Sequence, residues 1–152
     1  MDRQESSPNQ SSSLHHRVQI QLGARSYAID IGPGLIANPS TWQVLPKANM
    51  ALIVSNTTVA PIYGETLRNA LQSRFRRVEQ LVLPDGEAHK AWETLQLIFD
   101  ALLRIGADRK SVLFALGGGV VGDMTGFAAA SYMRGIPYVQ VPTCLLYTSR
   151  CV

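Results

Sequence analysis

The chain has 152 residues, of which 46% are hydrophobic and 16% are charged, and its formal net charge is +3. This composition is typical of a soluble globular domain, and no apolar run approaches the roughly 20 residues that cross a bilayer. Arg74, Arg76 and Arg77 form the densest basic group, with no aromatic residues interleaved, so we expect no nucleic-acid partner and no membrane partner.

Residues 1–16 are rich in Ser, Gln and Asn and lack the apolar stretch of a signal peptide. We interpret them as a disordered N-terminal extension and expect a cytoplasmic protein. The cysteines, Cys144 and Cys151, and the three histidines form neither a disulfide framework nor a metal-ligand cluster. We therefore expect no metal site in this chain.

The first regular elements are predicted to form a β-hairpin. Apolar and polar residues alternate in residues 17–22 and again in 26–31, and Gly23-Ala24-Arg25 stands between the two runs. This alternation is typical of two antiparallel strands with one face turned to solvent.

From residue 50 onward, strands and helices alternate. Met50–Val54 is a continuous apolar run, as expected of a strand that is covered on both faces. Further strands are predicted at residues 78–83, 111–116 and 138–141, and helices at 56–75, 91–105 and 123–133. This order predicts an α/β fold with a mainly parallel sheet.

The stretch "ALGGGVVGDMTG", residues 115–126, carries the pattern Gly117-x-Gly119-x-x-Gly122 between a predicted strand and a predicted helix. Such a loop lets a pyrophosphate approach bare backbone at a helix N-terminus. The acidic residue expected about 20 positions later is absent, because no Asp or Glu follows Asp123. The pattern alone leaves two interpretations open, a dinucleotide site and a glycine-rich turn that serves close packing.

Three other features also follow strand ends. Asp123 is predicted in the first helical turn, where the helix dipole stabilises a carboxylate and where ligand hydroxyls could bind. "DGEAHK", residues 85–90, either makes a turn and starts a helix or presents Glu87 and Lys90 to a ligand. Asn56 is either a helix cap or a ligand contact. Because the ends of parallel strands meet at one edge of a sheet, we favour a nucleotide site there.

The segments "PDGEAHK", "ALGGGVVGDMTGFAAASYMRG" and "YVQVPT" together resemble the 3-dehydroquinate synthase family of sugar-phosphate cyclases, from about residue 17 to Thr143. The resemblance implies a Rossmann-like NAD-binding α/β domain at residues 17–143, followed in the family by a helical metal-binding domain. It also implies NAD-dependent conversion of 3-deoxy-arabino-heptulosonate 7-phosphate to 3-dehydroquinate and phosphate in the shikimate pathway, by a homodimer that regenerates NAD in each turnover.

Site residues follow from the same resemblance. Arg134 matches the arginine that holds the anionic substrate, although it could also stabilise a helix C-terminus just before Gly135. Gly122 is expected to keep the turn tight. The catalytic metal, zinc or cobalt, would be held by one Glu and two His of the helical domain, so this chain is expected to be inactive alone. The residues expected to bind NAD are Asn56, Asp85, Gly86, Glu87, Ala88, His89, Lys90, Gly118, Gly119, Val120, Val121, Asp123 and Thr143.

Other functions stay open beside this one. Related sugar-phosphate cyclases make valiolones or desmethyl-4-deoxygadusol, and metal-dependent glycerol dehydrogenases are more distant relatives. A non-catalytic NAD-binding module is a further alternative.

The last nine residues, "CLLYTSRCV" at 144–152, depart from the family pattern, which places a second Thr at position 144. One nucleotide reading of this tail matches a transposon end used as a sequencing-library adapter, followed by its reverse complement. We therefore predict that the tail is not native and that the true protein is a longer, two-domain synthase.

Overall fold

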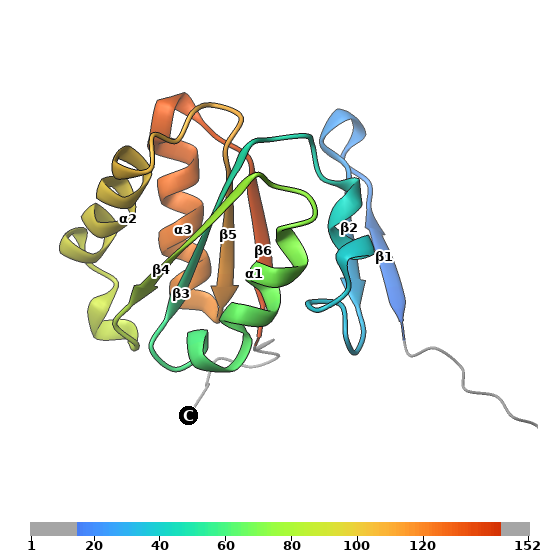
Figure 1. Cartoon of the computed structure of the whole chain (residues 1–152), viewed down its shortest axis with the longest axis horizontal. Coiled ribbons are helices and arrows are strands. Elements are labelled where there is room, and N and C mark those ends of the chain that lie inside the picture. The colour runs from blue at the N-terminus through green and yellow to red at the C-terminus, as the bar shows by residue number, and fades with distance from the viewer. Residues whose placement is uncertain (1–14, 144–152) are drawn as a thin grey trace, which may run out of the picture. The chain divides into compact units, whose positions relative to one another are not determined.

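The computed structural model describes residues 15–143 (Figure 1). The described residues fall into two compact units, 15–35 and 36–143. The predicted non-native tail at 144–152 lies outside the described residues, as does the predicted N-terminal extension apart from its last two residues.

The first unit contains the predicted hairpin. Strands β1 (His16–Ile20) and β2 (Tyr27–Ile31) pair antiparallel, with Val18 opposite Ile29, and a short helical turn at Gly23–Arg25 joins them. Val18 and Ile29, on the apolar face of the hairpin, are 45% and 41% exposed. Two strands alone offer no second layer on which this face could be buried.

The second unit contains a four-stranded parallel sheet in the order β4-β3-β5-β6. Its strands are β3 (Met50–Asn56), β4 (Arg77–Leu83), β5 (Val112–Gly117) and β6 (Tyr138–Pro142). The predicted α/β fold, with a Rossmann-like parallel sheet and an N-terminal hairpin, is thereby confirmed. All four strands end at the same edge of the sheet (Figure 1).

Helices cover both faces of this sheet, as the apolar β3 sequence predicts. Leu52 and Val54 pack in one core with residues of α2 (Trp92–Arg104) and α3 (Gly119–Ser131). Ala51 and Ile53 point to the other face and share a core with residues of α1 (Glu65–Leu71) and of the turn at Pro39–Val44. The alternation follows from the period of two along a strand.

Two predicted helix boundaries are wrong. The helix expected at residues 56–75 is an irregular turn at Ala60–Gly64 followed by α1, which ends at Leu71. Pro61 lacks the N–H that a regular helix needs there, and the chain turns after Leu71 to bury Phe75. Helix α3 begins at Gly119, four residues before the expected Asp123, because burial of Val121 against the core outweighs the poor helix propensity of glycine.

The longest helices among the described residues have 13 residues, and none of them is long and apolar enough to cross a membrane.

Candidate functional site: a nucleotide-binding edge

The candidate site residues gather where the four parallel strands end. Asn56 is the last residue of β3, Asp85 follows β4 by two residues, Gly117 ends β5 and Thr143 follows β6. Backbone hydrogen bonds connect neighbouring loops, from Thr143 N to the Gly117 carbonyl over 3.2 Å and from Thr57 N to the Leu83 carbonyl over 3.0 Å. The topology therefore brings together segments that lie far apart in the sequence.

Asn56 holds the loop after β4 in place. Its Nδ2 donates to Asp85 Oδ1 at 2.6 Å, and its Oδ1 accepts from Val59 N at 2.8 Å. Thr58 Oγ1 donates to the second Asp85 oxygen at 2.6 Å. Asn56 is 8% exposed. Because both of its amide groups are already bonded within the chain, Asn56 positions Asp85 as well as capping the turn.

Gly86 allows the sharp turn that follows. Its φ of +113° lies in the region that favours glycine, and its carbonyl accepts from His89 N at 3.1 Å. Residues Glu87–His89 form a single short helical turn before α2. The turn leaves Glu87, Ala88, His89 and Lys90 exposed at the sheet edge.

Lys90 connects this loop to helix α3. Its Nζ lies 2.7 Å from Asp123 Oδ2 and 3.7 Å from Glu87 Oε1. The hydrogen bond and charge of Asp123, followed by the charge of Glu87, raise the pKa of Lys90. Asp123 stands in the second turn of α3, so its expected place in the first turn is wrong. Its carboxylate is held by the lysine as well as by its position on the helix.

The glycines of the loop fall into two classes. A Cβ at Gly117 would lie 2.9 Å from Val121 Cγ2, so close packing explains this glycine. One at Gly122 would lie 2.7 Å from Nε2 at the end of the exposed Gln140 side chain, which can turn aside. A Cβ at Gly118 or Gly119 would meet nothing within 4 Å. Packing among the described residues therefore gives no reason for glycine at positions 118 and 119.

Gly118 also leaves the start of α3 without a side-chain cap. It is the N-cap residue, and no side chain accepts a hydrogen bond from the first turn. The first N–H groups of a helix have no partner within the helix and attract anions. The exposed Gly119 is the first helical residue, so a ligand can reach this end of the helix.

Arg134 does not join the other candidate residues within this chain. It follows α3, whose 13 residues extend about 20 Å from the glycine loop toward the opposite edge of the sheet. Met133 and Arg134 have φ values of 48° and 69°, so the helix ends here in left-handed backbone. The structure places Arg134 at a helix C-terminus, as one of the two interpretations of its sequence expects.

Two contributors to the edge were missed from the sequence. Thr58 binds Asp85, and the Tyr138 hydroxyl donates to the Gly122 carbonyl at 3.0 Å. Burial, with a smaller effect of the Asp123 charge, raises the pKa of Tyr138. The sequence pattern indicated Thr58 only as part of a helix cap and Tyr138 only as a residue of a strand.

The edge has chemical features that suit a dinucleotide. Gly118 and Gly119 stand at a helix start without a side-chain cap, and the open space beside them suits a pyrophosphate. The exposed carboxylates of Glu87 and Asp123 suit ligand hydroxyl groups as hydrogen-bond donors. Within residues 15–143, no three His, Cys, Asp or Glu side chains are grouped so that they could hold a metal ion.

Residues 80–150 match the family model described as 3-dehydroquinate synthase N-terminal. The resemblance to the 3-dehydroquinate synthase family is confirmed. The match covers the loop after β4, the glycine loop and β6, and it runs beyond Thr143, where the sequence predicted that the likeness ends.

Solved structures of sugar-phosphate cyclases share the fold. A 2-deoxy-scyllo-inosose synthase complexed with carbaglucose-6-phosphate, NAD+ and Co2+ is 24% identical over 84% of this chain, with a TM-score of 0.76. The 2-epi-5-epi-valiolone synthase of Streptomyces hygroscopicus subsp. jinggangensis 5008, with NAD+ and Zn2+ bound, is 36% identical over 72% of the chain, with a TM-score of 0.61.

A glycerol dehydrogenase from Schizosaccharomyces pombe is 20% identical over 72% of the chain, with a TM-score of 0.53. Its likeness and that of the inosose synthase show the fold alone. The chain spans 35%, 30% and 25% of the inosose synthase, valiolone synthase and glycerol dehydrogenase chains.

Proposed function

We propose that the C-terminal edge of the β3–β6 sheet binds NAD, with the pyrophosphate at Gly118 and Gly119. One observation carries this proposal: two adjacent glycines at an uncapped helix start have open space where their Cβ atoms would lie. A pyrophosphate needs that space and gains hydrogen bonds from the free N–H groups.

The neighbouring residues take different roles in this proposal. The carboxylates of Glu87 and Asp123 accept hydrogen bonds from ribose hydroxyls, and Lys90 neutralises the charge between them. Val121 is 3% exposed, so it contributes its backbone N–H and not its side chain. The remaining residues line the loops around the cofactor: Asp85, Gly86, Ala88, His89, Val120 and Thr143.

We infer that the whole protein is a 3-dehydroquinate synthase that converts 3-deoxy-arabino-heptulosonate 7-phosphate to 3-dehydroquinate and phosphate. Bound NAD supplies reversible oxidation of a substrate hydroxyl. The residues of this chain bind and orient that cofactor. The same proposal places the protein in the cytoplasm as a homodimer. In it, Arg134 contacts an anionic group of the substrate, and residues outside the described part of the chain hold zinc or cobalt.

A valiolone synthase is the second candidate, because the valiolone synthase of known structure is 36% identical to this chain. The motifs "GGGVVGDMTG" and "YMRG" favour the dehydroquinate branch. Phosphate release from 3-deoxy-arabino-heptulosonate 7-phosphate by the two-domain protein separates the candidates, since only the first predicts turnover of that substrate.

Calorimetric titration with NAD tests the cofactor site. We expect Gly119→Val to abolish NAD binding while the melting temperature stays unchanged, because the added side chain enters open space. Gly126→Ala is the matched control, since its Cβ would make ordinary 3.6 Å contacts with Tyr138 away from the loop. If the Gly119→Val protein binds NAD as tightly as the parent, these glycines serve the backbone only and the proposal fails.

A further inference from the structure

The opposite edge of the same sheet carries a concentration of positive charge. Lys47 lies just before β3, Arg74 and Arg76 lie just before β4, and Lys110 lies just before β5. Because β3 lies between β4 and β5 and all three strands are parallel, these four side chains come from segments that meet at one edge.

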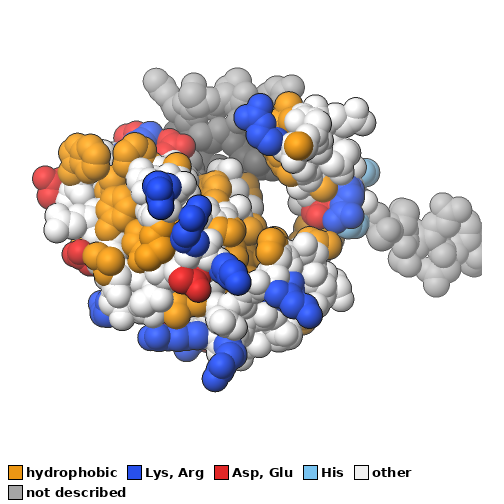
Figure 2. Space-filling model, turned by 90° about the horizontal axis from the view of Figure 1, so that it is seen from above, with side chains coloured by type: hydrophobic (Ala, Val, Ile, Leu, Met, Phe, Trp, Pro, Cys, Tyr) orange, Lys and Arg blue, Asp and Glu red, His pale blue; other side chains and the backbone are white. Residues whose placement is uncertain are grey.

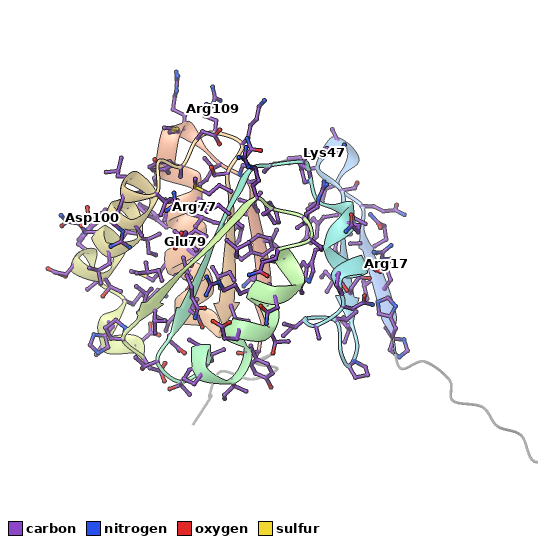
Figure 3. The ribbon with its side chains drawn as sticks, viewed as in Figure 1. Arg17, Lys47, Arg77, Glu79, Asp100 and Arg109 are labelled. Carbon is purple, nitrogen blue, oxygen red and sulfur yellow. The ribbon has the colours of Figure 1, made fainter. Side chains whose placement is uncertain are left out.

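These side chains line a single hollow. Its volume is about 420 Å³, and Ala48 and Asn49 complete the lining. That volume falls within the range of about 300–1,000 Å³ typical of small-molecule sites. Figure 2 looks onto this edge from above and shows several Lys and Arg side chains there, with an acidic side chain among them. Lys47 and Arg109 are both labelled near this edge in Figure 3.

No acidic side chain lines the hollow, and two acidic side chains of neighbouring segments bond to other groups. Asp108 Oδ1 accepts hydrogen bonds from Ser111 Oγ at 2.9 Å and from the backbone N of Lys110 at 2.9 Å. The Ser111 hydrogen bond is the main cause that lowers the pKa of Asp108, and the charge of Lys110 also helps to lower it. Glu79 binds Arg77 at 2.8 Å. Within residues 15–143, none of the four lining cations forms an ion pair.

Part of the Arg74 guanidinium is fixed in place by the surrounding structure. One of its terminal nitrogens donates to the Leu45 carbonyl, and its Nε is buried with no hydrogen-bond partner among the described residues. A buried N–H without a partner costs free energy, and so does the mutual repulsion of like charges. An anion in the hollow would reduce the repulsion among these cations.

We propose that this hollow binds a small molecule that carries two or more phosphate or carboxylate groups. Arginine suits such groups because its planar fork donates two parallel hydrogen bonds, while the lysines add point charges. The cations surround one hollow and do not form a stripe, and no aromatic side chain lines it, which favours a small ligand over a nucleic acid. The site lies at the other end of the strands from the NAD edge and does not depend on it.

Titration of the 152-residue chain with pyrophosphate at low ionic strength, followed by amide NMR shifts, tests the proposal. We expect shifts at residues 47–49, 74–76 and 110–111. Lys110→Glu and Arg76→Glu should each weaken binding at least about tenfold, the loss expected for one charge-assisted hydrogen bond. Inorganic phosphate should bind more weakly than pyrophosphate, and Gly119→Val should leave these shifts unchanged.

Arg109→Glu is the matched control, because Arg109 is exposed, adjoins Lys110 and does not line the hollow. The proposal predicts that this variant binds pyrophosphate within about twofold of the parent, the scale of a purely long-range charge effect. Equal losses in the Arg109→Glu and Lys110→Glu proteins would show unspecific charge attraction and overturn it. Absence of these shifts, or tighter binding of a single-stranded oligonucleotide than of pyrophosphate, would overturn it as well.

Discussion

The carboxamide of Asn56 binds the side chain of Asp85, which lies 29 residues further along the chain, and so connects the loops after β3 and β4. It donates to Asp85 and accepts from Val59 N, while only 8% of the residue is exposed. A buried amide whose oxygen and nitrogen are both hydrogen-bonded stabilises a fold. Removing that amide leaves its former partners buried without a hydrogen bond. Asn56 therefore fixes the position of the loop that carries Glu87 and Lys90.

Asn56→Ala should lower the free energy of unfolding by about 1–3 kcal/mol, because Val59 N and Asp85 both lose a partner. Urea unfolding followed by circular dichroism measures this change. Asn69→Ala is the control, since Asn69 is exposed on α1, and it should change stability by less than about 0.5 kcal/mol. Equal effects of the two substitutions would contradict the positioning role.

At single positions, the sequence predicted which residues gather but not how they are bonded. Asn56, Lys90 and Asp123 were all expected at the strand ends, and parallel pairing puts them there. The Lys90–Asp123 pair has its partners 33 residues apart, so no local pattern reveals it. Gly117, which packing requires, could not be separated from the open Gly118 and Gly119, because the difference depends on the position of the Val121 side chain.

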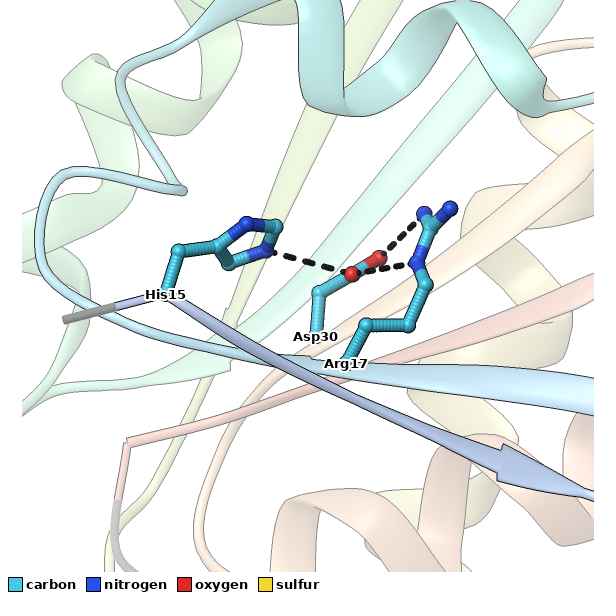
Figure 4. Close-up of polar contacts among 3 residues, drawn as sticks. All are labelled: His15, Arg17 and Asp30. Atoms are coloured by element: carbon cyan, nitrogen blue, oxygen red, sulfur yellow. Dashed lines mark hydrogen bonds and ion pairs between the residues drawn. The ribbon is translucent and has the colours of Figure 1, made fainter. Parts of the chain in front are cut away.

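At the scale of elements, an ion pair joins the two strands of the hairpin. Arg17 and Asp30 are register partners on β1 and β2, and two hydrogen bonds of 2.7 and 2.9 Å join their side chains (Figure 4). His15 Nε2 lies 3.2 Å from the same carboxylate. The hydrogen bond from Arg17 is the main cause that lowers the pKa of Asp30.

This lowered pKa predicts how the hairpin responds to acid. Folding favours the Asp30 carboxylate, so its contribution is complete above the unfolded pKa of about 3.9 and is lost as the pH falls through the lower folded value. Protection factors of the Val18 and Ile29 amides, measured between pH 6 and pH 2, should fall in that acid range.

Asp30→Asn should remove most of that pH dependence, because the asparagine does not titrate. Asp108→Asn supplies the control: the pKa of Asp108 is also lowered, mainly by the Ser111 hydrogen bond, but Asp108 belongs to the other unit. A hairpin that keeps its acid sensitivity in the Asp30→Asn protein would contradict the assignment to this pair.

Strands were easier to predict than helix ends, for a physical reason. Met50–Val54 and Val112–Leu116 are continuous apolar runs, and burial on both sheet faces requires that composition. The start of α3 is set by packing of Val121 and by the contact of Gly122 with β6, both of which override the propensity of a glycine-rich stretch. Local sequence carries little information about such contacts.

At the scale of the whole molecule, the chain corresponds to about a third of the sugar-phosphate cyclases whose fold it shares. It spans 35% of the inosose synthase and 30% of the valiolone synthase, and the described residues offer no metal-ligand group. The division into two compact units after residue 35 could not be predicted from the residue pattern. The predicted helix at 123–133 did place Arg134 at a helix C-terminus, but the sequence did not show that this helix begins at Gly119.

We therefore expect the 152-residue chain to have no dehydroquinate synthase activity. Phosphate release from 3-deoxy-arabino-heptulosonate 7-phosphate, assayed with NAD and with zinc or cobalt added, should stay at the rate without protein. A two-domain relative assayed in parallel verifies the reagents. Sustained turnover by this chain would show that the residues described here contain a complete site.

Mapping of NAD binding by amide NMR tests the central claim most directly. We predict binding weaker than about 1 μM, equivalent to less than about 8 kcal/mol, because one wall of the site alone contacts the cofactor. Shifts should concentrate at residues 85–90, at Gly118, Gly119 and Asp123, and at Thr143, and should spare Arg134. Shifts that concentrate elsewhere, or none at millimolar NAD, would contradict the assignment of this sheet edge as the cofactor site.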